Sequence, residues 1–336
     1  MKFILPAFAL LAAASAARAD SYSATFPAPA LDRWNYPFNP TPGTRITAST
    51  FGNEAGSALF DNRDGQFIVG FDTSPAIPAG LGADAYTVVS CVVELTSAND
   101  LIIEYDPTVD PYTAFLPTTD PEYADDADPG QPVELYGVGF RNGFSLANWT
   151  ETSPFGAGSA LNPSVRNAFA LGANAAGAMV DVSNSVRERW TPQPFAVGTV
   201  AGLKPGSLVP IDARLRFELD VAQPAVQSYL RTAVDAGRLR LSATSLTKVV
   251  QQGGNFPTFY CRENPLVIAL GTGAATLSIV VTTGSCVPAD LNCDGSVNAQ
   301  DIATLLSQWG AAGSADLNGD GAVGAPDIAI LLSAWN

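Results

Sequence analysis

The chain of 336 residues contains no histidine and few basic residues, and both shortages limit what it can do. Without an imidazole base, Ser-His-Asp and Cys-His mechanisms are excluded, and the usual nitrogen ligand of zinc is missing. The 17 Lys and Arg residues stand against 32 Asp and Glu residues, which gives a net charge of −15. Phosphate binding needs clustered basic residues, so we expect no nucleic-acid partner.

Long apolar runs are also scarce, and the main one lies at the N-terminus. One Lys precedes an apolar stretch over residues 3–17, and Ala17-Arg18-Ala19 has the small-x-small form of a cleavage site. This pattern predicts a secretory signal peptide over residues 1–19. The run is too short to span a bilayer comfortably, and no later segment of comparable length follows. We expect a secreted protein, free or attached to the cell surface, that does not span the membrane.

Cysteine occurs only four times, which in an exported chain permits three disulfide pairings. Cys286 and Cys293 lie close together in the sequence, which favours a local bridge between them. Cys91 and Cys261 lie in two predicted strands, which suggests the second pair. Buried free thiols are the alternative for Cys91 and Cys261, because sequence separation says nothing about distance in space.

The last 51 residues contain six acidic residues and no basic ones, and they hold an internal repeat. Residues 289–310 and 315–336 are identical at 15 of 22 positions, with an offset of 26. All six acidic residues fall at positions 1, 5 and 12 of two 12-residue loops. A solvated polar turn would scatter its charges, so this pattern indicates a built site.

The two loops have the layout of an EF-hand calcium site. Alternating oxygen ligands wrap a hard cation, position 7 supplies a backbone carbonyl, and glycine at position 6 allows the sharp turn. We therefore predict two Ca²⁺ ions. The predicted ligands are Asp290, Asn292, Asp294, Ser296 and Asp301 in the first loop and Asp316, Asn318, Asp320, Ala322 and Asp327 in the second.

Each loop runs into a short apolar pattern with the spacing of one helix face. The two faces are expected to bury one another, and Pro326 suits the start of the second helix. Such a small piece has little core, so calcium binding should supply a large part of its folding free energy. The residues of the two faces are Ile302, Leu305, Leu306 and Trp309, and Ile328, Leu331, Leu332 and Trp335.

Two copies of D-x-N-x-D-G-x-V-x-x-x-D, each followed by I-x-x-L-L-x-x-W, resemble a dockerin over residues 286–336. The resemblance implies a module that attaches a secreted protein, often a carbohydrate-active one, to a cohesin-like domain on a scaffold or cell surface. Many members of the family have Ser-Thr at loop positions 10 and 11, whereas this chain has Ala299-Gln300 and Ala325-Pro326. The identity of the partner is therefore open, and a calcium-stabilised cap without a partner is the alternative.

Residues 20–285 have the short, β-branched and aromatic runs of a β-sandwich. One helix is expected at residues 224–237, which end at a glycine. The order of strands and helix is similar to DNRLRE-type jelly-roll modules of secreted proteins, some of which bind polysaccharide. The predicted strands are 45–51, 66–73, 86–96, 101–105, 133–140, 214–221, 238–245, 266–270 and 276–281.

Residues 106–132 combine seven acidic residues with six prolines and no basic residue. Proline excludes helix and inner strand, so we predict a long solvated loop. Asp125, Asp126 and Asp128 are candidate ligands of another calcium ion, but their spacing matches no ligand template.

The large region offers candidate residues for carbohydrate chemistry but no catalytic pair. A glycosidase needs two facing carboxylates, and spacing along a sequence does not reveal such a pair. We therefore assign no catalytic residue. The candidate acids include Glu94, Glu104, Glu134 and Asp220, and the candidate residues for stacking on sugars are Trp34, Tyr36, Tyr112, Trp149 and Trp190.

The sequence thus predicts a mainly β protein with three parts: a signal peptide (1–19), a β-sandwich domain (20–285) and a small helical, dockerin-like calcium-binding domain (286–336). The favoured function is calcium-dependent binding or surface assembly, with a cohesin-like domain or surface scaffold as the protein partner and polysaccharide as a further candidate ligand. The alternatives are a histidine-free carbohydrate-active hydrolase or lyase, and a structural envelope protein.

Overall fold

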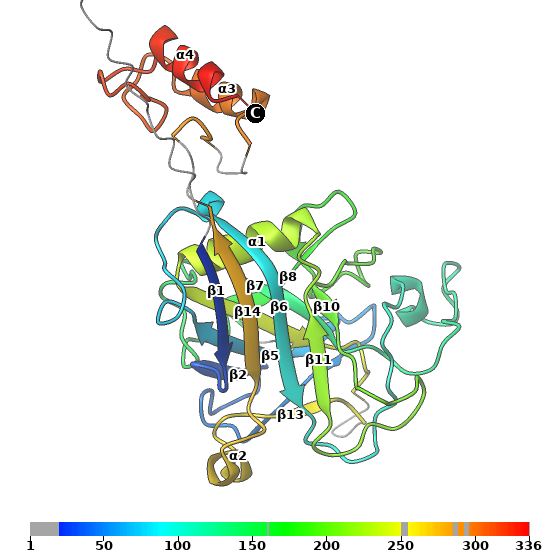
Figure 1. Cartoon of the computed structure of the whole chain (residues 1–336). Coiled ribbons are helices and arrows are strands. Elements are labelled where there is room, and N and C mark those ends of the chain that lie inside the picture. Colours follow the sequence, from blue (N-terminus) through cyan, green and yellow to red (C-terminus); the bar gives the residue numbers. More distant parts are fainter. Residues whose placement is uncertain (1–19, 160, 250–254, 285–287, 292–295, 336) are drawn as a thin grey trace, which may run out of the picture. The chain divides into compact units, whose positions relative to one another are not determined.

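A computed structural model describes residues 20–159, 161–249, 255–284, 288–291 and 296–335. Contacts divide the chain into a large unit, Ser21–Thr282, and a small one that contains Thr283–Asn336 (Figure 1). Among the residues that the structure describes, no helix has both the length and the apolar character needed to cross a bilayer. The chain is mainly β, as the sequence predicts.

The large unit is built from two sheets, with a short two-stranded ribbon beside them. The smaller sheet has the order β1 (Asp20–Phe26), β14 (Thr276–Thr283), β6 (Tyr86–Thr96) and β11 (Arg214–Glu218). The larger sheet has the order β2 (Leu31–Asn35), β5 (Arg63–Asp72), β12 (Arg238–Thr244), β7 (Glu134–Phe140), β8 (Ala168–Ala173) and β9 (Met179–Asp181). Outside this order, β4 (Phe51–Gly52) also pairs with β5 and β10 (Ala196–Val197) also pairs with β7. The separate ribbon joins β3 (Thr47–Ser49) to β13 (Thr258–Tyr260).

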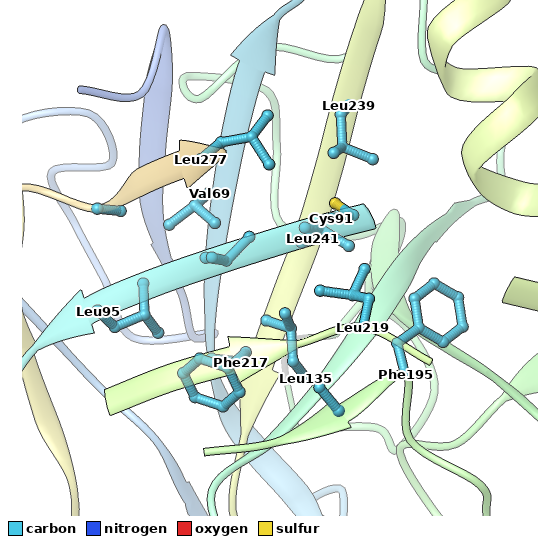
Figure 2. Close-up of a cluster of buried hydrophobic side chains, with 14 of the residues drawn as sticks. Val69, Cys91, Leu95, Leu135, Phe195, Phe217, Leu219, Leu239, Leu241 and Leu277 are labelled. Carbon is cyan, nitrogen blue, oxygen red and sulfur yellow. The ribbon is translucent and has the colours of Figure 1, made fainter. Parts of the chain in front are cut away.

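The main core fills the space between the two sheets (Figure 2). Period-2 alternation sends every second residue of a strand inward, so Cys91, Val93 and Leu95 of β6 are all buried. Opposing side chains come from the larger sheet, including Leu135 of β7 and Leu241 of β12. This packing confirms the predicted β-sandwich.

The outer face of the larger sheet is also buried, so β5 is covered on both sides. Ile68, whose neighbours along β5 point into the main core, packs instead with Val138 and Trp149 on that outer face. Buried ion pairs lie in the same layer. Arg63 bonds Glu134, and Arg166 bonds Asp61 at 2.7 Å.

One of the two α-helices described in the large unit was predicted from the sequence, and the other was predicted as a strand. The predicted helix at 224–237 is α1 (Pro224–Asp235), with Pro224 in its first turn and Gly237 just beyond its end at φ +68°. The predicted strand at 266–270 is wrong, because these residues form α2 (Pro265–Leu270). The Asn264 side chain caps α2 by accepting a hydrogen bond from the Leu266 N–H at 2.9 Å. End signals of this kind decide short apolar runs.

One further prediction for the large unit needs correction. Residues 101–105 form no strand, and only Glu104 makes an isolated bridge, to Leu208. In addition, two short 3₁₀ helices interrupt the loops, η1 (Ala83–Ala85) and η2 (Tyr112–Phe115).

The predicted disulfide between Cys91 and Cys261 is wrong, and both residues are buried free thiols. Phe259 bridges Ser97 in the antiparallel sense. Cys91 lies six residues before Ser97, or roughly 20 Å along an extended strand, whereas Cys261 lies two residues, about 7 Å, from Phe259. The two Cα atoms are therefore separated by well over the ~7 Å that a disulfide tolerates. Cys286 and Cys293 lie outside the described residues.

The small unit contains two nine-residue helices, α3 (Ala299–Ser307) and α4 (Ala325–Ser333). They pack around a core that includes Leu305 and Leu331, both without exposed surface. The prediction that all four apolar positions of each helix are buried is wrong. Each helix ends two residues before its tryptophan, so Trp309 and Trp335 do not continue the buried face, and both are about half exposed at 51% and 47%.

Candidate functional site

The second acidic loop of the small unit, residues 316–327, folds around its own carboxylates. The first carboxylate, Asp316, accepts hydrogen bonds from three backbone N–H groups, those of Gly319 (2.9 Å), Asp320 (3.1 Å) and Gly321 (2.8 Å). Gly321 has a φ of +97°, a conformation that other residues rarely adopt, so the backbone at loop position 6 requires glycine. The loop therefore holds its first predicted ligand in a fixed orientation.

The carboxylate at loop position 12 closes the same loop. Asp327 has no exposed surface, and it accepts hydrogen bonds from the backbone N–H groups of Leu317 (2.8 Å), Asn318 (3.0 Å) and Gly324 (2.7 Å). Desolvation alone would raise its pKa, but these hydrogen bonds outweigh desolvation and lower the pKa of Asp327. The side chain is accordingly an anion at neutral pH, as a calcium ligand must be.

The first loop repeats this arrangement where the structure describes it. Asp301 has no exposed surface and accepts a hydrogen bond from the Asn298 N–H at 2.8 Å, which corresponds to the Gly324–Asp327 bond of the second loop. Asp290 is likewise buried. Two of the predicted ligands, Asn292 and Asp294, lie outside the described residues.

The donor set of the loops fits a hard divalent cation. Side-chain oxygens come from Asp and Asn, and the backbone carbonyls of Ser296 and Ala322 stand at position 7 of each loop. In the second loop, Asn318 and Asp320 are joined by a hydrogen bond of 2.8 Å and are both exposed, so the two side chains occupy one side of the turn. Oxygen-only sites of this kind suit calcium.

A second feature of the small unit is a set of exposed apolar side chains, which we call its apolar surface and define as Leu306, Trp309, Ile330, Leu332 and Trp335. Each of these residues is more than one-third exposed. The only charged residues of α3 and α4, Asp301 and Asp327, are buried, so both helices present apolar and small polar groups to solvent. Exposed apolar patches on small soluble modules mark interaction sites.

The candidate catalytic acids of the large unit are used separately rather than as a pair. Glu134 is buried and forms two bonds to Arg63, of 2.8 and 3.2 Å, whereas Glu94 pairs with Arg214 at the surface at 2.9 Å. Asp220 holds the turn before α1 by accepting a hydrogen bond from the Ala222 N–H, and Glu104 is exposed. This arrangement offers no facing acid and base.

The sequence did not single out Asp32, which is the carboxyl on β2 with a strongly shifted pKa. It has 1% exposure and accepts a hydrogen bond from the Arg262 N–H at 2.7 Å. Burial raises the pKa of Asp32 to about 8, and the neighbouring Glu263 carboxylate adds to the shift. A general acid needs a raised pKa of this kind, but a side chain this deeply buried does not reach a polymeric substrate.

The candidate stacking aromatics fall into different environments. Trp149 is 3% exposed and belongs to the outer-face cluster, so it is not a sugar platform. Trp190 and Tyr112 are partly exposed and hydrogen-bond Glu188 and Glu122, respectively.

Trp34 and Tyr36 form the centre of an aromatic patch on the large unit. The two rings stack with centroids 4.8 Å apart, and Tyr36 meets Phe38 edge-on at 5.5 Å. Phe38 is 52% exposed, and the Arg45 guanidinium lies 5.0 Å from the Trp34 ring. The aromatic patch comprises Trp34, Tyr36, Phe38, Phe51, Phe60 and Phe256.

Comparison with known families identifies the small unit. Residues 288–336 match the Dockerin type I domain. Dockerin type I domains are calcium-binding modules of EF-hand type, and they bind cohesin domains. Comparison with curated proteins and with solved structures gave no match.

Proposed function

We propose that this protein is a secreted, calcium-dependent assembly protein. Its C-terminal dockerin type I module, residues 286–336, attaches the β-sandwich of residues 20–285 to a cohesin-like domain on a scaffold or cell surface. The observation that carries the proposal is the match to the Dockerin type I domain, together with the apolar side chains that the module leaves exposed. Residues 1–19 serve as the signal peptide for export.

Calcium binding gives the module its shape. The proposed ligands are the five residues of each loop, with Asp316 and Asp327 at the two ends of the second one. Six carboxylates in about fifty residues repel one another, and the core that opposes this repulsion is small. Bound calcium neutralises the carboxylates, so metal binding and folding are coupled. The backbone hydrogen bonds to Asp316 and Asp327 orient these side chains toward that role.

The apolar surface is the proposed contact with the cohesin-like partner. Leu306 and Trp309 of the first repeat correspond to Leu332 and Trp335 of the second, and all four are about half exposed. No charged side chain of α3 or α4 reaches solvent, so the contact rests on apolar burial and backbone groups. Aromatic anchors commonly contribute the most to such interfaces.

Calorimetric titration of the full chain against a panel of purified cohesin domains tests this contact. We expect binding in calcium and none in excess chelator. Replacement of Trp309 and Trp335 by Ala should weaken binding by at least about 30-fold, because truncated anchors cost about 2 kcal/mol or more. The matched control is Leu208→Ala, which removes an apolar side chain of similar exposure (44%) from the large unit. Unchanged affinity in the double tryptophan variant would exclude the apolar surface as the contact.

For the sandwich, we propose polysaccharide binding at the aromatic patch. Flat aromatic rings offer an apolar platform on which the faces of sugar rings stack, and the exposed edge of the patch around Phe38 is open to a polymer. Sedimentation with insoluble polysaccharides should carry the wild-type protein but less of a Tyr36→Ala/Phe38→Ala variant. Leu81→Ala, at a similarly exposed site, is the control.

The same preparation separates the alternatives. Release of reducing sugars that one carboxylate substitution abolishes would favour the histidine-free hydrolase or lyase and contradict a binding role. Neither binding nor release across the panel would favour a structural envelope protein.

A further inference from the structure

The proline-rich acidic segment 106–132 is a long loop, as predicted, interrupted only by η2, but two of its acidic residues are buried. Its chain turns back on itself, so that Asp106 and Asp110 on one turn meet Asp126 and Asp128 on another. Each of the four side chains offers one carboxylate oxygen to a set whose members all lie within 4.8 Å of one another. Only Asp126 and Asp128 of this set were named as candidates from the sequence, and Asp125 points elsewhere, toward the Tyr123 hydroxyl.

Burial distinguishes this cluster from an ordinary acidic surface. Asp106 is 3% exposed and Asp110 is 6% exposed. Each of the four residues has a buried carboxylate oxygen that has no hydrogen-bond partner among the described residues. None of the four forms an ion pair with a described Lys or Arg side chain. Buried anions without a counter-charge are strongly unfavourable, so the arrangement requires a positive partner.

The surrounding chain holds the carboxylates in place through their other oxygens. Asp106 Oδ1 accepts hydrogen bonds from the backbone N–H (2.8 Å) and hydroxyl (2.6 Å) of Thr108, and the same hydroxyl lies 2.6 Å from Asp128 Oδ2. Asp126 Oδ1 accepts one from the Ala127 N–H at 2.8 Å. These contacts leave Asp106 Oδ2, Asp128 Oδ1 and Asp126 Oδ2 as the oxygens without partners.

The backbone around the cluster is anchored on the sandwich side. The Tyr105 N–H donates to the Ser207 carbonyl at 2.8 Å, directly before Asp106. Gly130 has a φ of +99°, and a Cβ at this position would lie 3.0 Å from the Asp106 Cβ, so glycine lets the second turn approach the first. Contacts with the surrounding chain thus position the carboxylates of Asp106, Asp126 and Asp128.

We propose that Asp106, Asp110, Asp126 and Asp128 form a calcium site in the large unit, separate from the two loops of the dockerin module. The chemistry of the donors selects a hard cation, because all four are carboxylate oxygens. Calcium binds oxygen at 2.3–2.6 Å, so ligands on opposite sides of the ion lie about 4.8 Å apart. Magnesium at about 2.1 Å draws its ligands closer together and keeps several waters.

A proton is the competing partner for these carboxylates. Burial, together with the neighbouring carboxylates of Asp126 and Asp106, raises the pKa of Asp110 to about 9. Without a cation, the Asp110 side chain would therefore keep its proton at neutral pH. Calcium would displace that proton and tie residues 106–110 to residues 126–128.

Hydrogen exchange read by mass spectrometry on the full chain tests the site directly. The wild-type protein is compared at pH 7.5 in calcium, in magnesium and in excess chelator. We expect calcium to slow exchange in peptides from residues 106–132. Amides that exchange only when the ion is released should slow by about 100-fold when free calcium is 100 times the dissociation constant. Equal exchange in calcium and chelator would overturn the proposal, and protection by magnesium but not calcium would overturn the choice of ion.

Variants then locate the ligands. Asp106→Asn/Asp110→Asn keeps side-chain size but removes two ligand charges, and it should abolish calcium protection of residues 106–132. Asp125→Asn is the matched control, because it removes a neighbouring exposed charge outside the cluster, and its protection should equal that of the wild type. Protection that persists in the double variant would show that calcium is bound elsewhere.

Peptides from other parts of the same chain keep the result interpretable. Peptides of α3 and α4 report calcium binding by the dockerin module. Loss of calcium protection in those peptides can therefore be told apart from loss of calcium protection at residues 106–132. Peptides of β5 and β6 report whether the double variant retains the sandwich. If it does not, the wild-type comparison of calcium with chelator still decides the proposal.

Discussion

Replacement of Glu134 by Gln should destabilise the large unit far more than a surface charge change does. Arg63 and Glu134 are 1% and 3% exposed, and two hydrogen bonds of 2.8 and 3.2 Å join them across the larger sheet. Desolvation alone would lower the pKa of Arg63, but the attraction and hydrogen bonds of the Glu134 carboxylate outweigh it and keep that pKa above its ordinary value. In Glu134→Gln the guanidinium stays charged and buried without its counter-charge, which costs about 3–5 kcal/mol.

The rest of the Arg63 environment refines this magnitude. Its guanidinium also donates to the Val182 carbonyl at 3.0 Å and to the Ser185 hydroxyl at 2.8 Å. An Arg63→Met/Glu134→Leu double variant removes both charges but leaves these two acceptors unpaired, at about 1–3 kcal/mol each. The double variant should therefore lose less unfolding free energy than Arg63→Met and Glu134→Leu lose together. The difference, which is the coupling energy, should be at least about 2 kcal/mol.

Urea unfolding followed by circular dichroism measures these differences, with saturating calcium so that the dockerin module contributes the same transition throughout. Glu94→Gln is the control, because it breaks the exposed Glu94–Arg214 pair and should cost less than about 1 kcal/mol. A loss of unfolding free energy below about 1 kcal/mol for Glu134→Gln would refute the reasoning. So would losses for Arg63→Met and Glu134→Leu that simply add up to the loss of the double variant.

Three further outcomes are expected. The native pKa of Asp32 of about 8, against 3.8 for the ordinary side chain, means that the native state keeps a proton that the unfolded chain has lost. This contribution to stability is fully present below pH 3.8 and is lost as the pH rises to 8. In urea unfolding, the stability of Asp32→Asn relative to wild type should therefore increase by about 1.4 kcal/mol per pH unit across that window. A stability difference that does not change with pH would contradict the pKa shift. In the dockerin module, Leu331→Ala should cost about 2–5 kcal/mol because the side chain has no exposed surface, whereas the neighbouring, half-exposed Leu332→Ala should cost less than about 1, as read from the calorimetric transition of the module; equal losses would mean that the helix faces are assigned wrongly. Asp316→Ala removes a proposed ligand and the acceptor of three backbone N–H groups, so it should weaken calcium binding in a calorimetric titration and lower the melting temperature of the module, and equal melting of the wild type in calcium and in chelator would argue against the site.

The sequence by itself determined the features whose physics is local. Ligands of an EF-hand loop lie within twelve consecutive residues, so the alternation around Gly321 was sufficient to predict the fold of the loop, and the Dockerin type I match agrees with it. Helix α1 was predictable for the same reason, since its apolar period, its first proline and Gly237 all lie within one segment. β-Branched alternation likewise predicted the sandwich.

Only the tertiary structure decided the features that depend on contacts between distant segments. The fate of the Cys91 thiol depended on where β13 meets the end of β6. Half of each apolar helix pattern in the dockerin module proved to be exposed, because a two-helix core is too small to cover it. Asp106 and Asp128 are 22 residues apart in a segment without periodicity, and they meet only because the chain folds back on itself. Spacing along a sequence predicts a site when one turn of chain supplies all of its ligands, and it does not when the ligands are brought together by long loops.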